Sequence, residues 1–514
     1  MAKLTTFSKL LIVFLVVAAA FFGIRYAMDS GLISNSGSNN TENNYGSSSS
    51  SSSSNSDAIR IGVVTWGGYA GGQYFNEGFA ASSASRFSKE YGIDVEFVLN
   101  DDVDASLNAW KAGDIDLHWY TIDAFPTILP GLEAFDPVAL FQADWSRGGD
   151  AIVARRGIQS VADLKGKKIA VAELTPSHSF LIWLLDAGGL SIDDVEIVKQ
   201  ASAIDAAAAF KSQQVDAAVV WSPDDEQCIR SVPGSRVLES TRSASNIIAD
   251  FFFAKREYVN ANRDKLQKLY EGWMRGAAEI NSSASAKSKA GKILAEGLGI
   301  PEADAIAAID IGRLVSHGDN KNFFGLNTDF NGVDGSSLYL RMANEYQALG
   351  ILEGRAPSWR QISMPTLIQR TNLTGANDVA EATKTFTKVD DNAGRDLEAI
   401  ASKPVSISFR TGEHTLDENA KYIIDKEFVE IAKAFANARV RIEGNTDNVG
   451  SESSNIALSK KRARSVADYL IQEHSMSANR LIVVGNGPNK PLASNSTADG
   501  RAQNRRTDFQ LVRE

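Results

Sequence analysis

The fold of most of this chain is indicated by residues 160–224, which read SVADLKGKKIAVAELTPSHSFLIWLLDAGGLSIDDVEIVKQASAIDAAAAFKSQQVDAAVVWSPD. Short apolar runs with the length of buried strands alternate here with longer stretches of helical periodicity. This alternation is typical of an α/β fold with mostly parallel strands, and ligands of such sheets bind beyond the carboxyl ends of the strands. Strands are expected at 167–173, 195–200 and 215–221, and helices at 177–189 and 203–213.

The same alternation extends towards the amino terminus. Strands are expected at 58–66, 93–100 and 114–120, and helices at 79–92 and 105–113. Trp66, at the end of the first of these strands, opens the glycine-rich segment WGGYAGG. Its glycines would let backbone amides approach a ligand, but their spacing is not the GxGxxG of a dinucleotide site.

Helix-capping residues follow two of the later strands. Thr175 stands directly before Pro176, which is a strong signal for the start of a helix. The free amides and hydroxyls at that start favour an anion, although Thr175 and Ser177 could equally do no more than cap the helix. Ser222-Pro223-Asp224 repeats the pattern after the last strand, where Trp221 is expected to face the same crevice.

With AGDIDL at 112–117 and HGDNKNFFGL at 317–326, these segments resemble the solute-binding proteins of nitrate/sulfonate/taurine and thiamine-precursor ABC importers. The resemblance implies a two-lobed, type II periplasmic-binding-protein fold over 58–370 that closes on a small solute. The solute itself stays open, because Ser177 suits an anion whereas Asp123, Asp224 and Asp250 suit a cation. The solute-binding positions that the resemblance carries over are Trp66, Gly67, Asp123, Ser177, His178 and Trp221.

A second segment, GNTDNVGSESSNIALSKKRARSV at residues 444–466, places an acid in a glycine-bounded turn ahead of a basic helix. Asp447 is the acid. On the helix, Asn455 and Arg462 project from one flank of the apolar stripe, about 20° apart, while Lys461 faces the opposite side. Further strands are expected at 406–409, 439–444, 479–487 and 504–512, and a helix at 418–438.

This segment and the closing GRAQNRR are similar to the OmpA-like peptidoglycan-binding domain. The resemblance implies a smaller α+β domain over 401–514, after a connector at 371–400. It also implies that Asp447 binds the ammonium, and Arg462 the carboxylate, of the diamino acid in the peptide stem. Thr446, Asn455, Leu458 and Arg506 match positions that support or line this site. The alternatives are a turn-stabilising role for Asp447 and a salt bridge between it and Arg462.

The amino-terminal residues differ from the rest of the chain. LLIVFLVVAAAFFGI at residues 10–24 carries no charge and follows two lysines, which favours a membrane anchor over 1–28. A serine-rich tether over 29–57 follows it. The rival interpretation is a cleaved signal peptide ending near Ala18-Ala19-Ala20. An uncleaved anchor would hold the protein in the inner membrane by a single span, with its bulk in the periplasm of a Gram-negative-type bacterium.

Composition excludes several other functions for the 514-residue chain. Its net charge of −10 argues against nucleic-acid binding, and its single cysteine, Cys228, permits neither an internal disulfide nor a cysteine-based metal site. The five histidines lack metal-ligand spacing, and the adjacent Ser177 and His178 cannot form a nucleophile–base pair unaided. We therefore expect neither an enzyme nor a cofactor or metal site.

The sequence predicts a membrane-tethered protein that binds a solute and anchors non-covalently to peptidoglycan. Such a protein could serve ABC transport or report ligand occupancy, and whether a permease partner exists is left open. The first alternative is a structural cell-wall linker whose ligand lobe has degenerated. The second is a stator-like motility protein, which is disfavoured because residues 10–24 contain no ionisable carboxylate.

Overall fold

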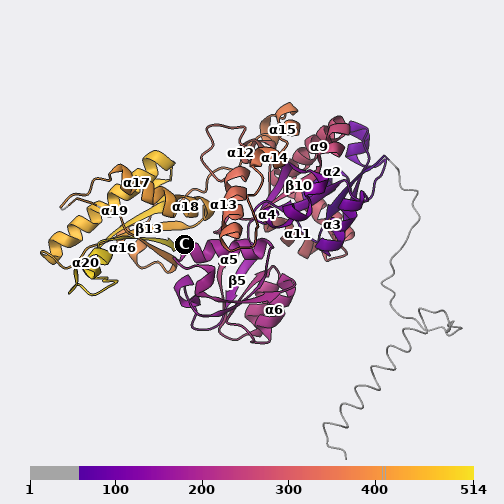
Figure 1. The fold of residues 1–514 in the computed structure, drawn as a ribbon. Coiled ribbons are helices and arrows are strands. Elements are labelled where there is room, and N and C mark those ends of the chain that lie inside the picture. The colour runs from indigo at the N-terminus through magenta and orange to yellow at the C-terminus, as the bar shows by residue number, and fades with distance from the viewer. Residues whose placement is uncertain (1–56, 408, 411, 514) are drawn as a thin grey trace, which may run out of the picture. The chain divides into compact units, whose positions relative to one another are not determined.

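Residues 57–407, 409–410 and 412–513 are described by the computed structural model (Figure 1). The predicted anchor over 1–28 and all but the last residue of the predicted tether lie outside this part of the chain. Among the helices within it, none is both long and apolar enough to cross a membrane.

The first lobe is built on a six-stranded sheet with the order β11-β4-β10-β3-β1-β2. The parallel pairing expected from the sequence holds for β1 with β2 and for β1 with β3, whereas β10 runs antiparallel to both β3 and β4. The strands are β1 (Ile59–Val63), β2 (Val95–Leu99), β3 (Leu117–Thr121), β4 (Pro137–Ser146), β10 (Ala249–Lys255) and β11 (Gly312–Leu314).

The second lobe is built on a five-stranded sheet with the order β7-β6-β8-β5-β9. Its strands are β5 (Asp150–Ala154), β6 (Lys168–Ala172), β7 (Glu196–Gln200), β8 (Ala217–Trp221) and β9 (Arg236–Ser240). The chain crosses between the two sheets twice, at 147–149 and at 241–248. We call this region of the two crossings and the strand ends beside them the lobe junction. The three strands and two helices expected within 160–224 are confirmed.

Helices surround both sheets (Figure 1). In the second lobe these are α5 (Pro176–Ala187), α6 (Ala203–Lys211) and α7 (Asp224–Ser231). In the first lobe they are α2 (Ala70–Phe75), α3 (Val103–Ala112), α4 (Phe125–Ile128), α8 (Arg256–Ala261), α9 (Arg263–Ser282), α10 (Ala284–Leu298), α11 (Glu302–Asp310) and α12 (His317–Phe323). The later helices are α13 (Gly335–Ala348), α14 (Trp359–Ile362), α15 (Thr366–Arg370) and α16 (Asp391–Arg395).

Two expectations for the first lobe are wrong. The glycine-rich segment after β1, whose glycines are expected to let backbone amides approach a ligand, contains α2, and a Cβ on Gly72 would lie 2.4 Å from the Trp273 ring of α9. That glycine therefore serves helix packing. The expected helix over 79–92 is reduced to a π-turn at Phe87–Tyr91. One reason is that the Asn76 side chain donates to the Ala80 and Val95 carbonyls and so competes with helical hydrogen bonds.

The carboxyl-terminal domain is a four-stranded sheet with the order β12-β15-β13-β14 (Figure 1, yellow). Its strands are β12 (Ala399–Val405), β13 (Arg439–Asn445), β14 (Leu481–Gly487) and β15 (Thr507–Val512). Its helices are α17 (Glu418–Ile424), α18 (Glu430–Ala434), α19 (Glu452–His474) and α20 (Ala498–Asn504), and a π-turn at Asp425–Val429 joins α17 to α18.

One strand position expected in this domain is wrong, and the last expected strand begins slightly later than predicted. The first strand ends at Val405 instead of covering 406–409, because its register is set by antiparallel pairing with β15. The last strand starts only at Thr507. The residues before it form α20, which Thr497 caps by accepting a hydrogen bond from the Gly500 amide at 3.0 Å.

Candidate functional site

Two glycines bring α19 into close contact with the carboxyl-terminal sheet. A Cβ on Gly444 of β13 would lie 2.2 Å from the Ser459 carbonyl oxygen, and one on Gly485 of β14 would lie 2.6 Å from the Lys460 nitrogen. Neither space admits a methyl group. The backbone of α19 therefore lies directly on these strands, beside the turn that follows β13 and carries Asp447.

Asp447 lies in that turn with its side chain 13% exposed. Its Oδ1 accepts a hydrogen bond from the Val449 amide at 3.1 Å, which is an Asx-type turn contact. Its Oδ2 accepts one from Arg505 Nη1 at 2.7 Å. The turn-stabilising alternative is thus realised together with an ion pair, but the partner in that ion pair is Arg505 and not Arg462.

Arg462 is buried on α19, on the flank expected from the sequence. Its Nε donates to the Glu413 carbonyl at 3.1 Å, and its guanidinium lies 4.8 Å from the centre of the Phe409 ring. Burial and the neighbouring charge of Arg505 lower the pKa of Arg462, and the charge of Asp447 opposes that shift. The two arginines and the one carboxylate therefore form a single electrostatic cluster.

The other residues expected at this site have different surroundings. The Thr446 amide donates to the Gly487 carbonyl at 2.9 Å, and Asn455 Nδ2 donates to the Val449 carbonyl at 3.1 Å, so both hold the turn. Leu458 is half-buried on α19. Arg506, in contrast, makes a two-point ion pair with Asp508, at 2.8 and 2.9 Å.

Arg505 is the residue that the sequence reasoning missed. The two consecutive arginines in GRAQNRR are the sequence feature that could have indicated an arginine partner for Asp447. Which of the two side chains reaches Asp447 depends on the chain path between α20 and β15, and that path cannot be read from the motif.

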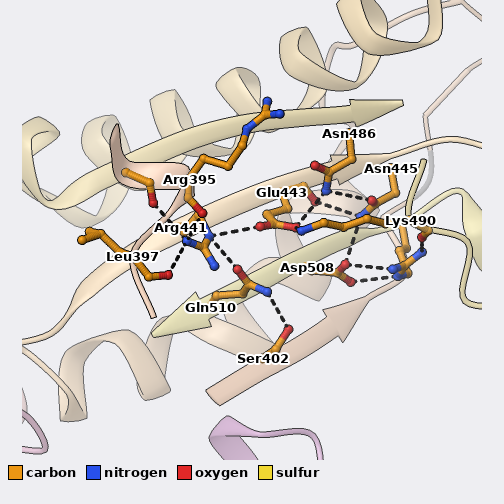
Figure 2. A network of polar contacts seen from close by, with 12 residues as sticks. Arg395, Leu397, Ser402, Arg441, Glu443, Asn445, Asn486, Lys490, Asp508 and Gln510 are labelled. Carbon is orange, nitrogen blue, oxygen red and sulfur yellow. Dashed lines mark hydrogen bonds and ion pairs between the residues drawn. The ribbon is translucent and has the colours of Figure 1, made fainter. Parts of the chain in front are cut away.

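Through its ion pair with Asp508, Arg506 joins a buried polar network on the sheet of this domain. Figure 2 shows Asp508 and other members of this network. Glu443 lies at its centre and accepts from Lys490 Nζ at 2.7 Å and from Asn486 Nδ2 at 2.8 Å, while Arg441 lies 3.0 Å away. Burial raises the pKa of Glu443, but the hydrogen bonds from Lys490 and Asn486 and the charges of Lys490 and Arg441 outweigh it, and the pKa is lowered. This network fixes the strand ends that carry the site.

Four buried carboxylates gather at the lobe junction. Asp123 follows β3, Asp144 lies near the end of β4, Asp150 opens β5 and Asp250 lies in β10, and none of them is more than 6% exposed. Asp250 is the cross-strand partner of Asp144 in the antiparallel pair of β10 and β4. Like charges in that position repel, so this arrangement is unfavourable for the sheet by itself. We call these four residues the junction acids.

The hydrogen-bond partners of the junction acids are neutral. Trp66 Nε1 donates to Asp144 Oδ2 at 2.6 Å. Tyr69 Oη donates to Asp250 Oδ2 at 2.6 Å, and Ser146 Oγ donates to Asp150 Oδ2 at 2.8 Å. Within the described part of the chain, no hydrogen bond reaches Asp144 Oδ1 or either carboxylate oxygen of Asp123.

The environment at the junction makes these acids hard to ionise. Burial raises the pKa of Asp123 to about 8, with a smaller upward contribution from the charges of Asp150 and Asp250 and an opposing one from the nearby Ser179 hydroxyl. Burial also raises the pKa of Asp144 to about 7 and that of Asp150 to about 6. The pKa of Asp250 is raised by burial and by the charge of Asp144.

The remaining residues expected to bind solute are placed as follows. A Cβ on Gly67 would lie 2.2 Å from the Ala308 backbone, so this glycine packs against α11. Ser177 Oγ is buried in the first turn of α5, and no described group bonds to it.

His178 and Trp221 are the last two of these residues. His178 Nδ1 accepts from the Leu174 amide at 3.4 Å, and burial lowers the pKa of His178. Trp221 is 38% exposed and pairs with Asp150 across β8 and β5. Asp224, a further acid considered for a cation, instead forms an ion pair with Lys211 at 3.2 Å.

Comparison with known proteins assigns both parts of the chain. Residues 408–505 form an OmpA-family domain, and residues 78–283 match the family described as NMT1/THI5 like. The expected combination of a solute-binding-like domain with an OmpA-like domain is thereby confirmed.

Three similar proteins illustrate the match. Outer membrane porin F of Pseudomonas aeruginosa is 32% identical over 126 residues, 24% of this chain and 36% of that protein. Peptidoglycan-binding protein ArfA of Mycobacterium tuberculosis is 46% identical over 90 residues, 18% of this chain and 27% of that protein. The chain thus spans well under two thirds of either relative. The crystal structure of the periplasmic aliphatic sulphonate binding protein SsuA from Escherichia coli is 22% identical, with a TM-score of 0.48, covering 64% of this chain and 98% of that one.

Proposed function

We propose that this protein is a cell-envelope component that holds peptidoglycan through Asp447 and Arg462 and binds a small solute at the lobe junction. The wall-binding half is supported by the OmpA-family domain and by its likeness to ArfA, whose name describes a peptidoglycan-binding protein. The observation that carries it is the cluster of Asp447, Arg462 and Arg505, which presents both signs of charge beside one turn.

The ligand of this cluster is the zwitterionic end of a diamino acid in the peptide stem. Asp447 accepts from its ammonium, and Arg462 donates to its carboxylate, because charge-assisted hydrogen bonds supply orientation as well as binding energy. Arg505 Nη1 lies 2.7 Å from Asp447 Oδ2. The incoming ammonium shares that carboxylate with Arg505, whose charge also helps to hold the ligand carboxylate.

The solute-binding half is supported by the NMT1/THI5-like match and by the four carboxylates at the lobe junction. Buried acids with few partners lower stability unless a ligand compensates them, which favours a working site over the degenerate lobe of a wall linker. Binding, not catalysis, is the activity that we assign to both halves. In this proposal residues 1–28 anchor the protein in the inner membrane, residues 29–57 form the tether, and an ABC permease is a candidate recipient of the solute.

Co-sedimentation with purified sacculi tests the wall-binding half. Asp447→Asn keeps an oxygen for the Val449 amide but loses the charge, so we expect sacculus affinity to fall about tenfold or more. Arg462→Gln should have a similar effect. Lys461→Ala, an exposed neighbour on the same helix, is the matched control and should sediment like the unaltered protein. Unchanged sedimentation of both charge variants would refute the assignment.

A further inference from the structure

We propose that the solute bound at the lobe junction is a small organic cation that carries a primary amine or a guanidinium group. The inference rests on the proposed solute-binding function and names its ligand class. It is carried by the junction acids, Asp123, Asp144, Asp150 and Asp250, and above all by the carboxylate oxygens among them that lack a hydrogen-bond partner.

The first step concerns charge. A buried carboxylate is costly unless it is paired with a cation, and the groups that bond to Asp144, Asp150 and Asp250 are an indole, a serine hydroxyl and a phenol. None of these carries a positive charge. A cation that enters the junction would therefore compensate several acids at once.

Two arginines lie on the crossing segments, and neither takes the place of such a cation. Arg147 offsets part of the charge of Asp144, but its Nη2 is paired with Glu381 at 2.6 Å. Arg242 is exposed, and its side chain packs against Gly148. The strongest influences on Asp123 besides burial come from the Ser179 hydroxyl, its own backbone and two further acids, Asp150 and Asp250.

The second step concerns hydrogen-bond donors. Asp123 is fully buried, and neither of its carboxylate oxygens has a hydrogen-bond partner among the described residues, nor does Asp144 Oδ1. The Ser179 hydroxyl near Asp123 shares a hydrogen bond with Tyr346 Oη at 2.8 Å, in which either oxygen can be the donor, and its influence lowers the pKa of Asp123. A ligand that satisfies the carboxylate oxygens must bring hydrogen-bond donors. A primary ammonium or guanidinium brings N–H donors together with the positive charge, which a quaternary ammonium does not.

The third step separates an organic cation from a metal ion and from an anion. In the described part of the chain, no three acidic, histidine or cysteine side chains converge in a way that could hold a metal ion. The start of α5 would suit an anion, but Asp123 stands close enough for Ser179 of that helix to lower its pKa. Asp123 belongs to the first lobe and Asp150 to the second, so an amine between the lobes would contact both.

Thermal shift and calorimetric titration of the full-length protein test the proposal with four probes. Ethanolamine and agmatine carry the required N–H donors. Choline has the same charge as ethanolamine without those donors, and ethanesulfonate is an anion. We expect at least one of the two amines to raise the unfolding temperature and to bind about tenfold or more tightly than choline and ethanesulfonate.

Variants place the effect at the junction. Asp123→Asn should weaken binding of the amine by about tenfold or more, and Asp250→Asn should act in the same direction. Asp193→Asn, which removes an exposed carboxylate of the second lobe, is the matched control and should bind like the unaltered protein. The circular dichroism spectrum and the unfolding temperature of each variant without added probe show whether the chain is still folded.

The outcomes distinguish this inference from the function on which it rests. Preferential binding of ethanesulfonate, or equal binding of choline and ethanolamine, would overturn the amine assignment and leave solute binding standing. A bound amine that is insensitive to Asp123→Asn and Asp250→Asn would also overturn it. If no probe of either charge shifts the unfolding temperature, both the amine assignment and the solute-binding proposal lose their support.

Discussion

Among single residues, Asp123 and Arg480 show two ways in which this chain buries a charge. Arg480 of the carboxyl-terminal domain donates to the carbonyls of Ala438, Ala432 and Phe435 at 2.8, 2.7 and 2.9 Å. Asp123 is equally enclosed, but its carboxylate oxygens have no hydrogen-bond partner in the described part of the chain. The first arrangement stabilises the fold, whereas the second costs stability, and we propose that its unpaired oxygens serve a ligand.

Asp123→Asn should stabilise the ligand-free protein near pH 8 and have little effect at about pH 4 or below. The pKa of Asp123 is raised to about 8 in the native state, from an ordinary value of 3.8. The native state therefore holds this proton more tightly than the unfolded state. The wild type loses about 1.4 kcal/mol per pH unit as the pH rises from about 4 towards 8, and the variant avoids this loss. Urea unfolding of both proteins at the two pH values measures the difference, and a pH-independent difference would contradict the prediction.

Arg480→Met should destabilise the carboxyl-terminal domain by about 2–4 kcal/mol, because three buried carbonyls lose their charged donor. Methionine fills much of the same space, so lost packing contributes little. Denaturant unfolding followed by circular dichroism provides the measurement. Arg464→Met, at a half-exposed position on α19, is the control and should change the free energy of unfolding by less than about 0.5 kcal/mol.

Individual site residues could be predicted only where a motif specifies both residue type and element. The positions of Asp447 and Arg462 were predicted in this way, because a turn after a strand and a flank of a helix are local properties, and their role in binding stays a prediction. Arg505 was missed and Arg506 was chosen instead. The difference between these neighbours lies in which one reaches Asp447 and which one pairs with Asp508, and both contacts join segments distant in sequence.

At the scale of elements, the close packing of α19 on the sheet decides whether the cluster of Asp447, Arg462 and Arg505, which we propose binds the cell wall, can form. Ser459 and Arg462 are carried by this helix, and the turn with Asp447 directly follows β13. The helix can lie this close only because residue 444 has no side chain.

Gly444→Ala should therefore reduce both stability and sacculus binding. The new methyl group would lie 2.2 Å from the Ser459 carbonyl oxygen, which is backbone and cannot rotate away. We expect a loss of about 1–3 kcal/mol in the free energy of unfolding, as for other overpacked sites. Gly412→Ala would not serve as a control for overpacking, because φ at Gly412 is +75° and alanine would strain the backbone there. Ala457→Gly, at an exposed position of α19, tests the helix alone and should lower stability by about 1 kcal/mol without loss of binding.

The elements that the sequence predicted well are those with strong local periodicity. The alternation within 160–224 and the long helix over 452–474 are of this kind. The π-turn at Phe87–Tyr91 and the early end of β12 were not predicted. In the first case the Asn76 side chain, which bonds to the carbonyls of Ala80 and Val95, competes with helical hydrogen bonds, and in the second the register with the distant strand β15 sets the boundary.

For the whole molecule, the two proposed sites should fail independently. The lobe junction and the Asp447 cluster are built on different sheets, with no strand in common. Asp447→Asn should abolish sedimentation with sacculi and leave the thermal shift by the amine intact. Asp123→Asn should abolish the thermal shift by the amine and leave sedimentation with sacculi intact. Both measurements on each of the two full-length variants check this. Loss of both activities in a folded single variant would show that the sites are coupled.

The sequence by itself determined the α/β class and the division into a solute-binding-like part and an OmpA-like part, and it placed Asp447 in a turn and Arg462 on a helix flank. These follow from short motifs and from periodicities of two and 3.6 residues, which each segment carries alone. Only the tertiary structure decided that Arg505 pairs with Asp447 and that four acids, spread from residue 123 to residue 250, meet at the lobe junction. The physical reason is that burial and pairing of charges depend on contacts between distant segments, which no local pattern contains.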